Sequence, residues 1–457
     1  MATLVPFRGL VYSPSRIPDF SAVVAPPYDV ISEEKACQYR ARHPNNIVHI
    51  DLPEGASPQK YEDAARTLAR WRASGVLARD ETPSIYVTSQ RYSVRGMPER
   101  TRWGFIALLR IEEDSAGVVL PHERTMDKPR SDRRDLILAT RAQISPIFVL
   151  YSDPPGEIST LIEPVVHRPA DRWVSDESGV DTRLWRIGDQ DTIRAIQECL
   201  SARKIWIADG HHRYAAAREA RNQLAAGERP GHTATVGYDH VLAYFSNVDA
   251  PGLTILPYHR VLRGIARNDV AALSHKIEAW FDVKNFSFEG FDHRAEQIRR
   301  RLREVADRGR IAVALYSGGA EFVLLVFRQG ARSDALLTDL PEPLRDLDVS
   351  VLHRAVFESA LGMTPDVQRS GLALRYTEEI ERAMSWVDAA DDQVAFLLNT
   401  PRRTQMLSVA EKGLQMPQKS TYFYPKVLTG LVLHPFDTID NGAATPDVAP
   451  NGAAIRD

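Results

Sequence analysis

The sequence predicts a multidomain protein of the α+β class, and three observations lead to this prediction. The chain has 457 residues, which is more than one hydrophobic core of ordinary size organises. Helical and extended patterns occur in blocks along the chain and do not alternate as repeating β-α-β units. Hydrophobic residues make up 44% of the sequence and charged residues 26%, which is the balance of an ordinary globular protein.

Residues 1–115 are expected to form an N-terminal α+β domain. Apolar residues at helical spacing in residues 56–77 indicate a helix, and residues 84–93 have the pattern of a strand. A turn at residues 95–98 returns the chain into a second apolar strand at residues 102–111. These two strands together predict a β-hairpin.

The remaining chain is expected to divide into two further domains and a tail. Residues 116–265 carry the densest polar motifs and form the predicted central domain. Residues 266–436 are predicted to be a C-terminal α+β domain, because two amphipathic helices precede a hairpin that turns at residues 317–320. Residues 437–457 are rich in Asn, Gly, Ala, Pro and Asp, so we expect a disordered tail.

Charge and cysteine content exclude several classes of protein. The formal net charge is −3, which gives no reason to expect a nucleic-acid partner. Cys37 and Cys199 are too few for a disulfide framework or a cysteine-based zinc site, as in a protein of the reducing cytoplasm. No apolar run reaches the roughly eighteen residues of a membrane span, and no signal peptide is recognisable. We therefore expect a cytoplasmic protein without a membrane partner.

The most informative motif is a turn between a predicted strand and a predicted helix. It consists of Asp209, Gly210, His211, His212 and Arg213. A helix N-terminus presents free backbone N–H groups and the positive end of the helix dipole, and both favour an anion. The Arg213 guanidinium matches phosphate oxygens, the histidines can donate to phosphate or carry a proton, and Asp209 can cap the helix or hold Mg²⁺. For Asp209 alone, an ordinary N-cap is the favoured interpretation, whereas the whole motif favours a functional site.

A second motif, Pro121-His122-Glu123, combines a rigid residue with an ionisable pair. Pro121 fixes the backbone, so that His122 and Glu123 are held at a defined angle. A carboxylate held in this way can take a proton from a hydroxyl group or from water during phosphoryl transfer. The alternative is the solvated start of a charged helix.

A third motif, Lys419-Ser420-Thr421, lies near the end of the predicted folded chain. Lys419 can neutralise a phosphate or a carboxylate, and the two hydroxyl groups can donate hydrogen bonds to the same oxygens. The alternative is a strand that closes a sheet, and we accept this alternative for the aromatic residues 422–424. Weaker candidates are Asp29 and the pair His259-Arg260, which either line the site or belong to surface turns.

Six proline- and histidine-containing motifs together resemble the family called "domain of unknown function 1015". The likeness extends over nearly the whole chain before the tail, and the family name implies no chemistry. The motifs are Ala25-Pro26-Pro27-Tyr28-Asp29, Pro121-His122-Glu123, Ser145-Pro146-Ile147-Phe148, Ala208 to Tyr214, Leu256-Pro257-Tyr258-His259-Arg260 and Met416 to Lys426.

Three of these motifs also resemble, in the same order, motifs of the archaeal free serine kinases of the ParB and sulfiredoxin superfamily. This resemblance implies a ParB/sulfiredoxin-like catalytic core within residues 116–265. It implies that Glu123 is the base, with His122 and Asp209 beside it in the catalytic group, and that Asp209 holds the metal. It further implies phosphate or nucleotide binding by Gly210, His211, His212 and Arg213, and substrate binding by Lys419, Ser420 and Thr421.

The sequence therefore predicts a phosphoryl-transfer enzyme that acts on free serine or phosphoserine in serine biosynthesis. We favour release of serine from phosphoserine, although a site that stabilises the transferring phosphoryl group serves both directions. Phosphoserine phosphatase and nucleotide-dependent serine kinase both remain open. The expected cofactors are Mg²⁺ and ADP or ATP, and the expected partner is a small phosphorylated metabolite. The alternative is a nucleotide-binding ParB-like switch protein without small-molecule turnover.

Overall fold

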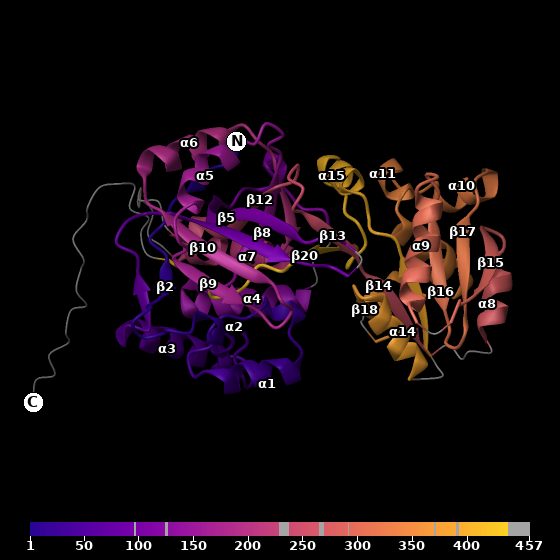
Figure 1. Ribbon diagram of the computed structural model, residues 1–457, viewed down its shortest axis with the longest axis horizontal. Helices are drawn as coiled ribbons and strands as arrows, with labels where there is room; N and C mark the ends of the chain where they lie inside the picture. The colour runs from indigo at the N-terminus through magenta and orange to yellow at the C-terminus, as the bar shows by residue number, and fades with distance from the viewer. Residues whose placement is uncertain are drawn as a thin grey trace, which may run out of the picture.

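The computed structural model has two lobes, each built from helices packed on a β-sheet (Figure 1). The predicted mixture of helices and strands is confirmed, and the strands form several sheets. No helix in the described part of the chain has the length and apolar character needed to cross a membrane. The structure describes residues 1–95, 97–123, 127–227, 237–264, 269–290, 292–369, 372–389 and 393–436.

The first lobe is organised by a nine-stranded sheet of order β6-β11-β8-β12-β5-β4-β10-β9, with β1 paired to β5. The β6/β11 and β8/β12 pairs are parallel and the other pairs are antiparallel. Because β5 pairs with β12, strands from both sides of residue 115 share this sheet. The strands are β1 (Leu4–Val5), β4 (Ile85–Tyr92), β5 (Arg100–Arg110), β6 (Val119–Leu120), β8 (Ile147–Tyr151), β9 (Arg172–Ser175), β10 (Asp181–Ile187), β11 (Ile205–Asp209) and β12 (His240–Asn247).

The β4–β5 hairpin appears as the sequence predicts, with Tyr86 opposite Ile106. Alternate residues of each central strand enter different cores, because successive side chains of a strand point to opposite faces. In β12, for example, Leu242 and Tyr244 belong to one core, whereas Ala243 and Phe245 belong to the other. The sheet is therefore buried on both faces.

Helices cover these two faces of the first lobe. In α6, Ile193, Ile196 and Leu200 recur at helical spacing and are buried against the sheet, and Asp189 caps the helix by accepting from the Thr192 N–H at 2.8 Å. The other elements are α1 (Glu33–Arg42), α2 (Val48–Asp51), α3 (Gln59–Ala73), α4 (Asp127–Thr140), α5 (Glu157–Val166), α6 (Gln190–Ser201), α7 (His211–Ala226), β2 (Leu10–Tyr12), β3 (Leu77–Arg79) and β7 (Ala142–Gln143).

The second lobe contains an antiparallel six-stranded sheet of order β15-β17-β16-β19-β14-β18. The predicted hairpin across residues 317–320 is β16–β17, with Val313 opposite Leu325. Its strands are β14 (His259–Arg263), β15 (Phe281–Ser287), β16 (Ala312–Tyr316), β17 (Glu321–Phe327), β18 (Leu374–Thr377) and β19 (Gln393–Leu398). Its helices are α8 (Asp269–Ile277), α9 (Arg294–Ala306), α10 (Ala331–Leu337), α11 (Glu342–Arg345), α12 (Asp348–Val351), the π-helix Leu352–Ala360, α13 (Pro365–Arg369), α14 (Ile380–Asp388) and α15 (Arg403–Glu411).

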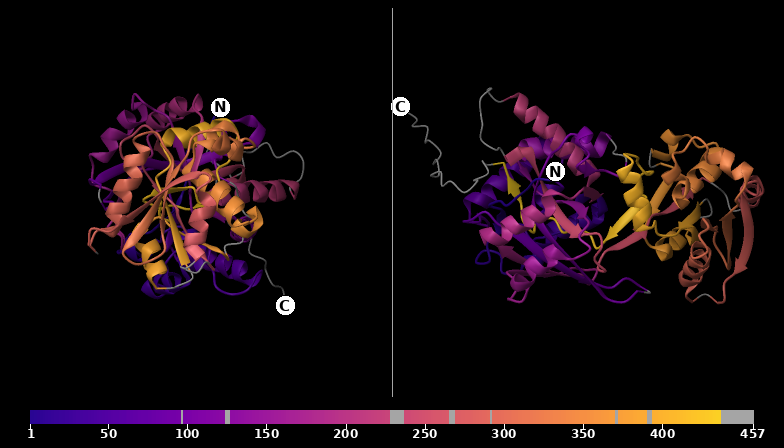
Figure 2. Two further views of the ribbon diagram at one scale, coloured as in Figure 1. Left: turned by 90° about the vertical axis from the view of Figure 1, so that its right-hand side faces the viewer. Right: turned by 90° about the horizontal axis from the view of Figure 1, so that it is seen from above.

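After α15 the chain returns to the first lobe, where the yellow segment runs among the indigo and magenta elements (Figure 2). Strand β20 (Thr421–Tyr424) pairs with β13 (Thr254–Pro257), and β21 (His434–Pro435) pairs with β7. Between them, Thr429 forms an isolated bridge with Ala25. The end of the predicted domain 266–436 therefore packs with the first lobe, and the predicted tail lies outside the described residues.

Candidate functional site

Three segments that are far apart in the sequence meet at the carboxyl end of β11. The backbone N–H groups of His122 and Glu123 donate to His211 Nε2 at 3.2 and 3.3 Å. The Glu123 carboxylate in turn accepts from the Thr421 N–H at 3.1 Å, across 298 positions of sequence. The fold thus brings the three predicted motifs into one place.

The strand-to-helix turn forms as the sequence predicts, with β11 ending at Asp209 and α7 beginning at His211. Gly210 has φ +86°, a left-handed conformation that favours glycine, and a Cβ at this position would lie only 3.0 Å from Arg213 Nε, so the guanidinium would have to shift. The first helical hydrogen bond runs from the Tyr214 N–H to the Gly210 carbonyl at 2.9 Å. The N–H groups of residues 211–213 therefore precede the helical ladder and are oriented for an anion.

Asp209 pairs with two cations. Its Oδ2 lies 2.8 Å from Arg213 Nη2, and its Oδ1 lies 2.8 Å from Lys426 Nζ. Burial raises the pKa of Asp209, but Lys426 and Arg213 outweigh burial and hold this pKa well below its usual range. The Asp209 carboxylate is thus ionised and each of its oxygens binds a cation.

This pairing does not fit the predicted role of Asp209 as a metal ligand, because a metal ion would have to displace both cations. Within the described ranges, no group of three His, Cys, Asp or Glu side chains is placed to hold a metal ion. Mg²⁺ at phosphoryl-transfer sites is held by one or two carboxylates together with the phosphates of the substrate, so a Mg²⁺ that arrives with the ligand stays a prediction. The steps considered below assign no role to a metal ion.

Arg213 is buried, and its guanidinium is already engaged. Nη1 donates to Ser145 Oγ at 3.0 Å and to the Pro146 carbonyl, and Nη2 contacts Asp209. The guanidinium that the sequence suggested for phosphate therefore fixes the start of α7 to the segment before β8. Anion binding at this turn would depend on the backbone N–H groups instead.

His122 and His211 are internal, neutral side chains. His211 Nε2 is an acceptor for two backbone N–H groups, and burial, followed by the nearby His122, lowers its pKa well below the ordinary value. His122 Nδ1 donates to the Ile207 carbonyl at 2.7 Å, and burial lowers its pKa as well. The remaining His122 nitrogen, Nε2, lies 2.9 Å from Thr421 Oγ1. Both rings hold the Pro121-His122-Glu123 segment in place.

Glu123 uses one carboxylate oxygen to order the third motif. Oε1 accepts from the Ser420 N–H, the Thr421 N–H and the Thr421 hydroxyl, each at 3.1 Å. No described residue donates to Oε2. Glu123 is therefore oriented by one oxygen and has the other available to accept a proton.

Lys419 supplies a cation to the same neighbourhood, because its charge and that of Glu123 both act on the pKa of His212. Its backbone is left-handed, with φ +55°, and its Nζ lies 5.1 Å from the centre of the Tyr258 ring. Among the described residues no carboxylate lies within ion-pair distance of Lys419. The buried Arg260 supports the same loop, because its Nη2 donates to the Lys419 carbonyl at 2.9 Å. Burial lowers the pKa of Arg260 to about 10.

His212 is half-buried at the start of α7, and burial lowers its pKa. The charges of Asp29, Lys419 and Glu123 also act on this pKa, so His212 is near all three. Charges of both signs gather in this neighbourhood. Among the described residues, Arg260 and Lys419 have no carboxylate within ion-pair distance, so these two cations are available to attract an anionic ligand.

Two cations of this neighbourhood were not assigned to the site from the sequence: Lys426 was given no role, and Arg260 was only a weak candidate. Lys426 belongs to the same motif as Lys419, and only the fold shows that it reaches Asp209. Arg260 was predicted to lie either in the site or in a surface turn, and the surface turn is wrong because Arg260 and His259 are buried in β14. The proline that precedes Tyr258-His259-Arg260 was the available signal, but it did not distinguish a turn from a buried strand.

The comparisons with known proteins give one family and several weak structural likenesses. The family described as "Protein of unknown function (DUF1015)" matches residues 4–350. Among curated proteins, no significant match was found.

Three solved structures illustrate the structural likenesses. A conserved hypothetical protein from Pyrococcus furiosus is 15% identical, with a TM-score of 0.32 over 68% of this chain and 89% of its own. A free serine kinase variant in complex with ADP is 14% identical, with a TM-score of 0.33 over 69% of this chain and 89% of its own. SbnI with a C-terminal truncation, from Staphylococcus aureus, is 11% identical, with a TM-score of 0.34 over 71% of this chain and 85% of its own.

Proposed function

We propose that this chain, which belongs to the DUF1015 family, transfers a phosphoryl group to or from the hydroxyl oxygen of free serine. We favour phosphoserine as the substrate and serine as the product, with water or a nucleoside diphosphate as the acceptor. The observation that carries the proposal is the meeting of Glu123, the N-terminus of α7 and Lys419 in one site. The choice of serine rests on the resemblance of these three motifs to those of the free serine kinases, and with it we propose a ParB/sulfiredoxin-like core in the first lobe.

In this proposal the N-terminus of α7 and Lys419 bind the phosphate. The N–H groups of residues 211–213 would donate to phosphate oxygens, and Lys419 would neutralise their charge. Asp209, Arg213 and Lys426 would hold these groups in position, since their charges are already paired. Charge stabilisation by preorganised donors is the main requirement of phosphoryl transfer.

Glu123 is the proposed base. In hydrolysis, a water oxygen forms the new bond to phosphorus, the bond between phosphorus and the seryl oxygen breaks, and Glu123 Oε2 accepts the proton of the water. The departing seryl oxygen takes up a proton and becomes the hydroxyl group of serine. In the opposite direction Glu123 would accept the proton of that hydroxyl as its oxygen attacks the terminal phosphorus of a nucleotide. The bond between this phosphorus and the bridging oxygen breaks, and the nucleotide leaves one phosphate shorter.

The test is an assay of purified protein with phosphoserine and Mg²⁺, with and without ADP, in which serine, phosphate and ATP are measured. We expect serine release, together with phosphate if water is the acceptor and with ATP if ADP is the acceptor. Glu123→Gln should lower turnover about 10²–10⁴-fold, because it removes the base. Its amide oxygen can still accept from the Ser420 and Thr421 N–H groups, so the loop should keep its shape.

The matched control is Glu411→Gln, which changes an exposed glutamate at the end of α15 and should leave turnover unchanged. Full turnover in Glu123→Gln would contradict the assignment of the base. Retained ADP binding without any turnover of serine or phosphoserine would contradict the enzyme and favour the nucleotide-bound switch.

A further inference from the structure

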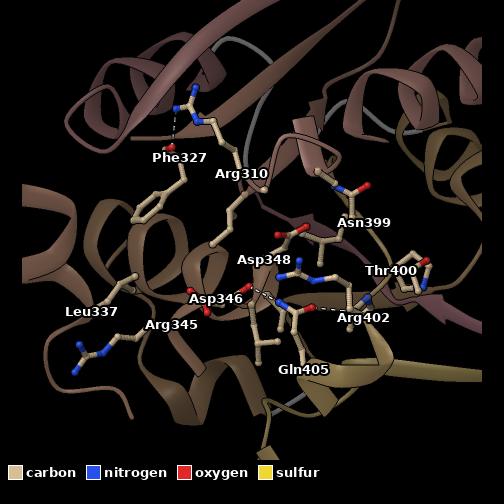
Figure 3. A pocket seen from close by; sticks show the side chains of 18 of the residues that line it. Arg310, Phe327, Leu337, Arg345, Asp346, Asp348, Asn399, Thr400, Arg402 and Gln405 are labelled. Atoms are coloured by element: carbon tan, nitrogen blue, oxygen red, sulfur yellow. Dashed lines mark hydrogen bonds between the residues drawn. The ribbon is translucent and has the colours of Figure 1, made fainter. Parts of the chain in front are cut away.

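A cavity of about 450 Å³ lies in the second lobe (Figure 3). Its walls come from the end of β17, the α10–α12 region and the loop at residues 399–402 that leads into α15. The cavity has the size of a small-molecule site. Its lining mixes charged groups with an apolar wall formed by Leu337, Leu347 and Val349.

Two of the arginines that line the cavity are already engaged by the protein. Arg310 Nη2 donates to the Phe327 carbonyl at 2.9 Å. Arg345 donates to the carbonyls of Leu340 and Thr338 at 2.7 and 2.9 Å. Neither guanidinium therefore has its full set of donors available for a ligand.

Asp348 and Arg402 differ from these residues because they face the cavity without a direct charged partner. No described cation lies within 4 Å of the Asp348 carboxylate, and no described residue accepts from the Arg402 guanidinium. In Figure 3 the Arg402 side chain extends toward Asp348. Burial raises the pKa of Asp348 to about 7, although Asn399 and Arg402 oppose this rise. The Asp348 carboxylate accepts hydrogen bonds from the side chain and the backbone of Asn399 but has no described cation within 4 Å, and it shares the cavity with the Arg402 guanidinium.

The backbone beneath these two groups is fixed. Gln405 Oε1 accepts from the Arg402 N–H at 2.9 Å, and Gln405 Nε2 donates to the Asp346 carbonyl at 2.7 Å. Figure 3 shows both hydrogen bonds crossing the floor of the cavity. The two walls are therefore joined before any ligand arrives, which lowers the ordering cost of binding.

The balance of available charge selects the class of ligand. Asp334, Asp346 and Asp348 contribute carboxylates. Of the four lining arginines, Arg310 and Arg328 pair with Asp282 and Arg345 donates to two backbone carbonyls, so Arg402 is the one with no acceptor among the described residues. A nucleotide would place its phosphates beside three carboxylates, and this repulsion opposes its binding. A ligand with one ammonium group and one carboxylate matches both signs, and the apolar wall accommodates an uncharged side chain.

We propose that this cavity binds a small α-amino acid with an uncharged side chain, whose ammonium group contacts Asp348 and whose carboxylate contacts Arg402. The site is separate from the Glu123 cluster, and the proposal does not depend on the proposed function. Ser420 also lines the cavity, and its N–H donates to Glu123, so the two sites border the same loop.

Equilibrium dialysis of the full chain with radiolabelled L-leucine, and then with L-valine and L-serine, tests the proposal. L-Leucine has no hydroxyl group to phosphorylate, so its binding reports on the cavity and not on the proposed reaction. We expect one equivalent to bind, and we expect Asp348→Asn and Arg402→Gln each to weaken binding about tenfold or more, since each removes one charged contact. Asp307→Asn and Arg332→Gln, which change exposed charges of the same lobe outside the cavity, should bind as the wild type does.

Circular dichroism of each variant shows whether it is folded. Absence of binding by all three amino acids would overturn the proposal, as would binding that survives both Asp348→Asn and Arg402→Gln. Either result would leave the phosphoserine assay unaffected, so the two proposals fail separately.

Discussion

The Asp209 cluster in the first lobe and the cavity in the second lobe both collect charged side chains, but they use charge in opposite ways. Asp209 binds two cations directly, at 2.8 Å each, and these cations come from the next helical turn and from the returning C-terminal segment. In the cavity, Asp348 and Arg402 face the same space without a direct ion pair.

The difference shows which charges support the fold and which are available to a ligand. A buried carboxylate that has its counter-ions keeps a low pKa and holds segments together, as Asp209 does. A carboxylate that is removed from water without a counter-ion has a raised pKa and costs stability, as Asp348 does. The second kind of group is the one that a ligand can stabilise.

The largest expected change in stability follows a substitution in the Asp209 cluster. Lys426→Met should lower the free energy of unfolding by about 3 kcal/mol, because it leaves Asp209 largely buried with one of its two cations. Urea unfolding followed by tryptophan fluorescence measures the change. The control is Lys412→Met, which breaks an exposed pair with Glu342 and should cost less than about 1 kcal/mol. Equal effects of the two substitutions would show that the Asp209 pairing is not structural.

The substitution Asp348→Asn in the cavity should raise the free energy of unfolding, by less than Lys426→Met lowers it. Because the folded pKa of Asp348 is raised to about 7, the folded state holds a proton that the unfolded state releases near pH 4. The contribution of this group to stability is complete below about pH 4 and is lost as pH rises through about 7.

Asp348→Asn removes this loss, so the variant should exceed the wild type in stability by about 1–2 kcal/mol at pH 8, and the difference should shrink toward pH 5. Thermal unfolding at the two pH values, without added amino acid, measures it. A wild type that is more stable than Asp348→Asn at pH 8 would mean that the carboxylate has a counter-ion, and the contrast with Asp209 would no longer hold.

The smallest expected effect concerns the hydroxyl group that joins two motifs of the first lobe. Thr421→Val removes the hydroxyl group, which donates to Glu123 Oε1 and lies 2.9 Å from His122 Nε2, but keeps the backbone N–H bond to Glu123. We expect a loss of about 1 kcal/mol in stability and less than about tenfold in turnover. Thr404→Val, at an exposed position of α15, is the control for the change of side chain. A loss of turnover as large as that of Glu123→Gln would give Thr421 a part in the reaction itself.

Local features of the first lobe were predictable because local patterns determine them. The β4–β5 hairpin and the strand-turn-helix at residues 205–226 follow from apolar periodicity and from turn residues close together in sequence. The extent of the first lobe was harder to predict from the sequence, because β5 pairs with β12 and β13 pairs with β20 across long sequence separations. No periodicity within a window reveals which distant strands will pair.

The two sites also depend on contacts between distant segments, which local sequence patterns do not reveal. The sequence determined that Glu123, the Asp209 turn and Lys419 carry groups suited to phosphate chemistry, because residue type and the position of Gly210 at a helix start are local properties. Tertiary structure decided that Arg213 and Lys426 are paired with Asp209, that His122 and His211 are internal, and that Asp348 and Arg402 share a cavity without pairing. The physical reason is that pairing and burial depend on distances between segments that only the folded chain brings together.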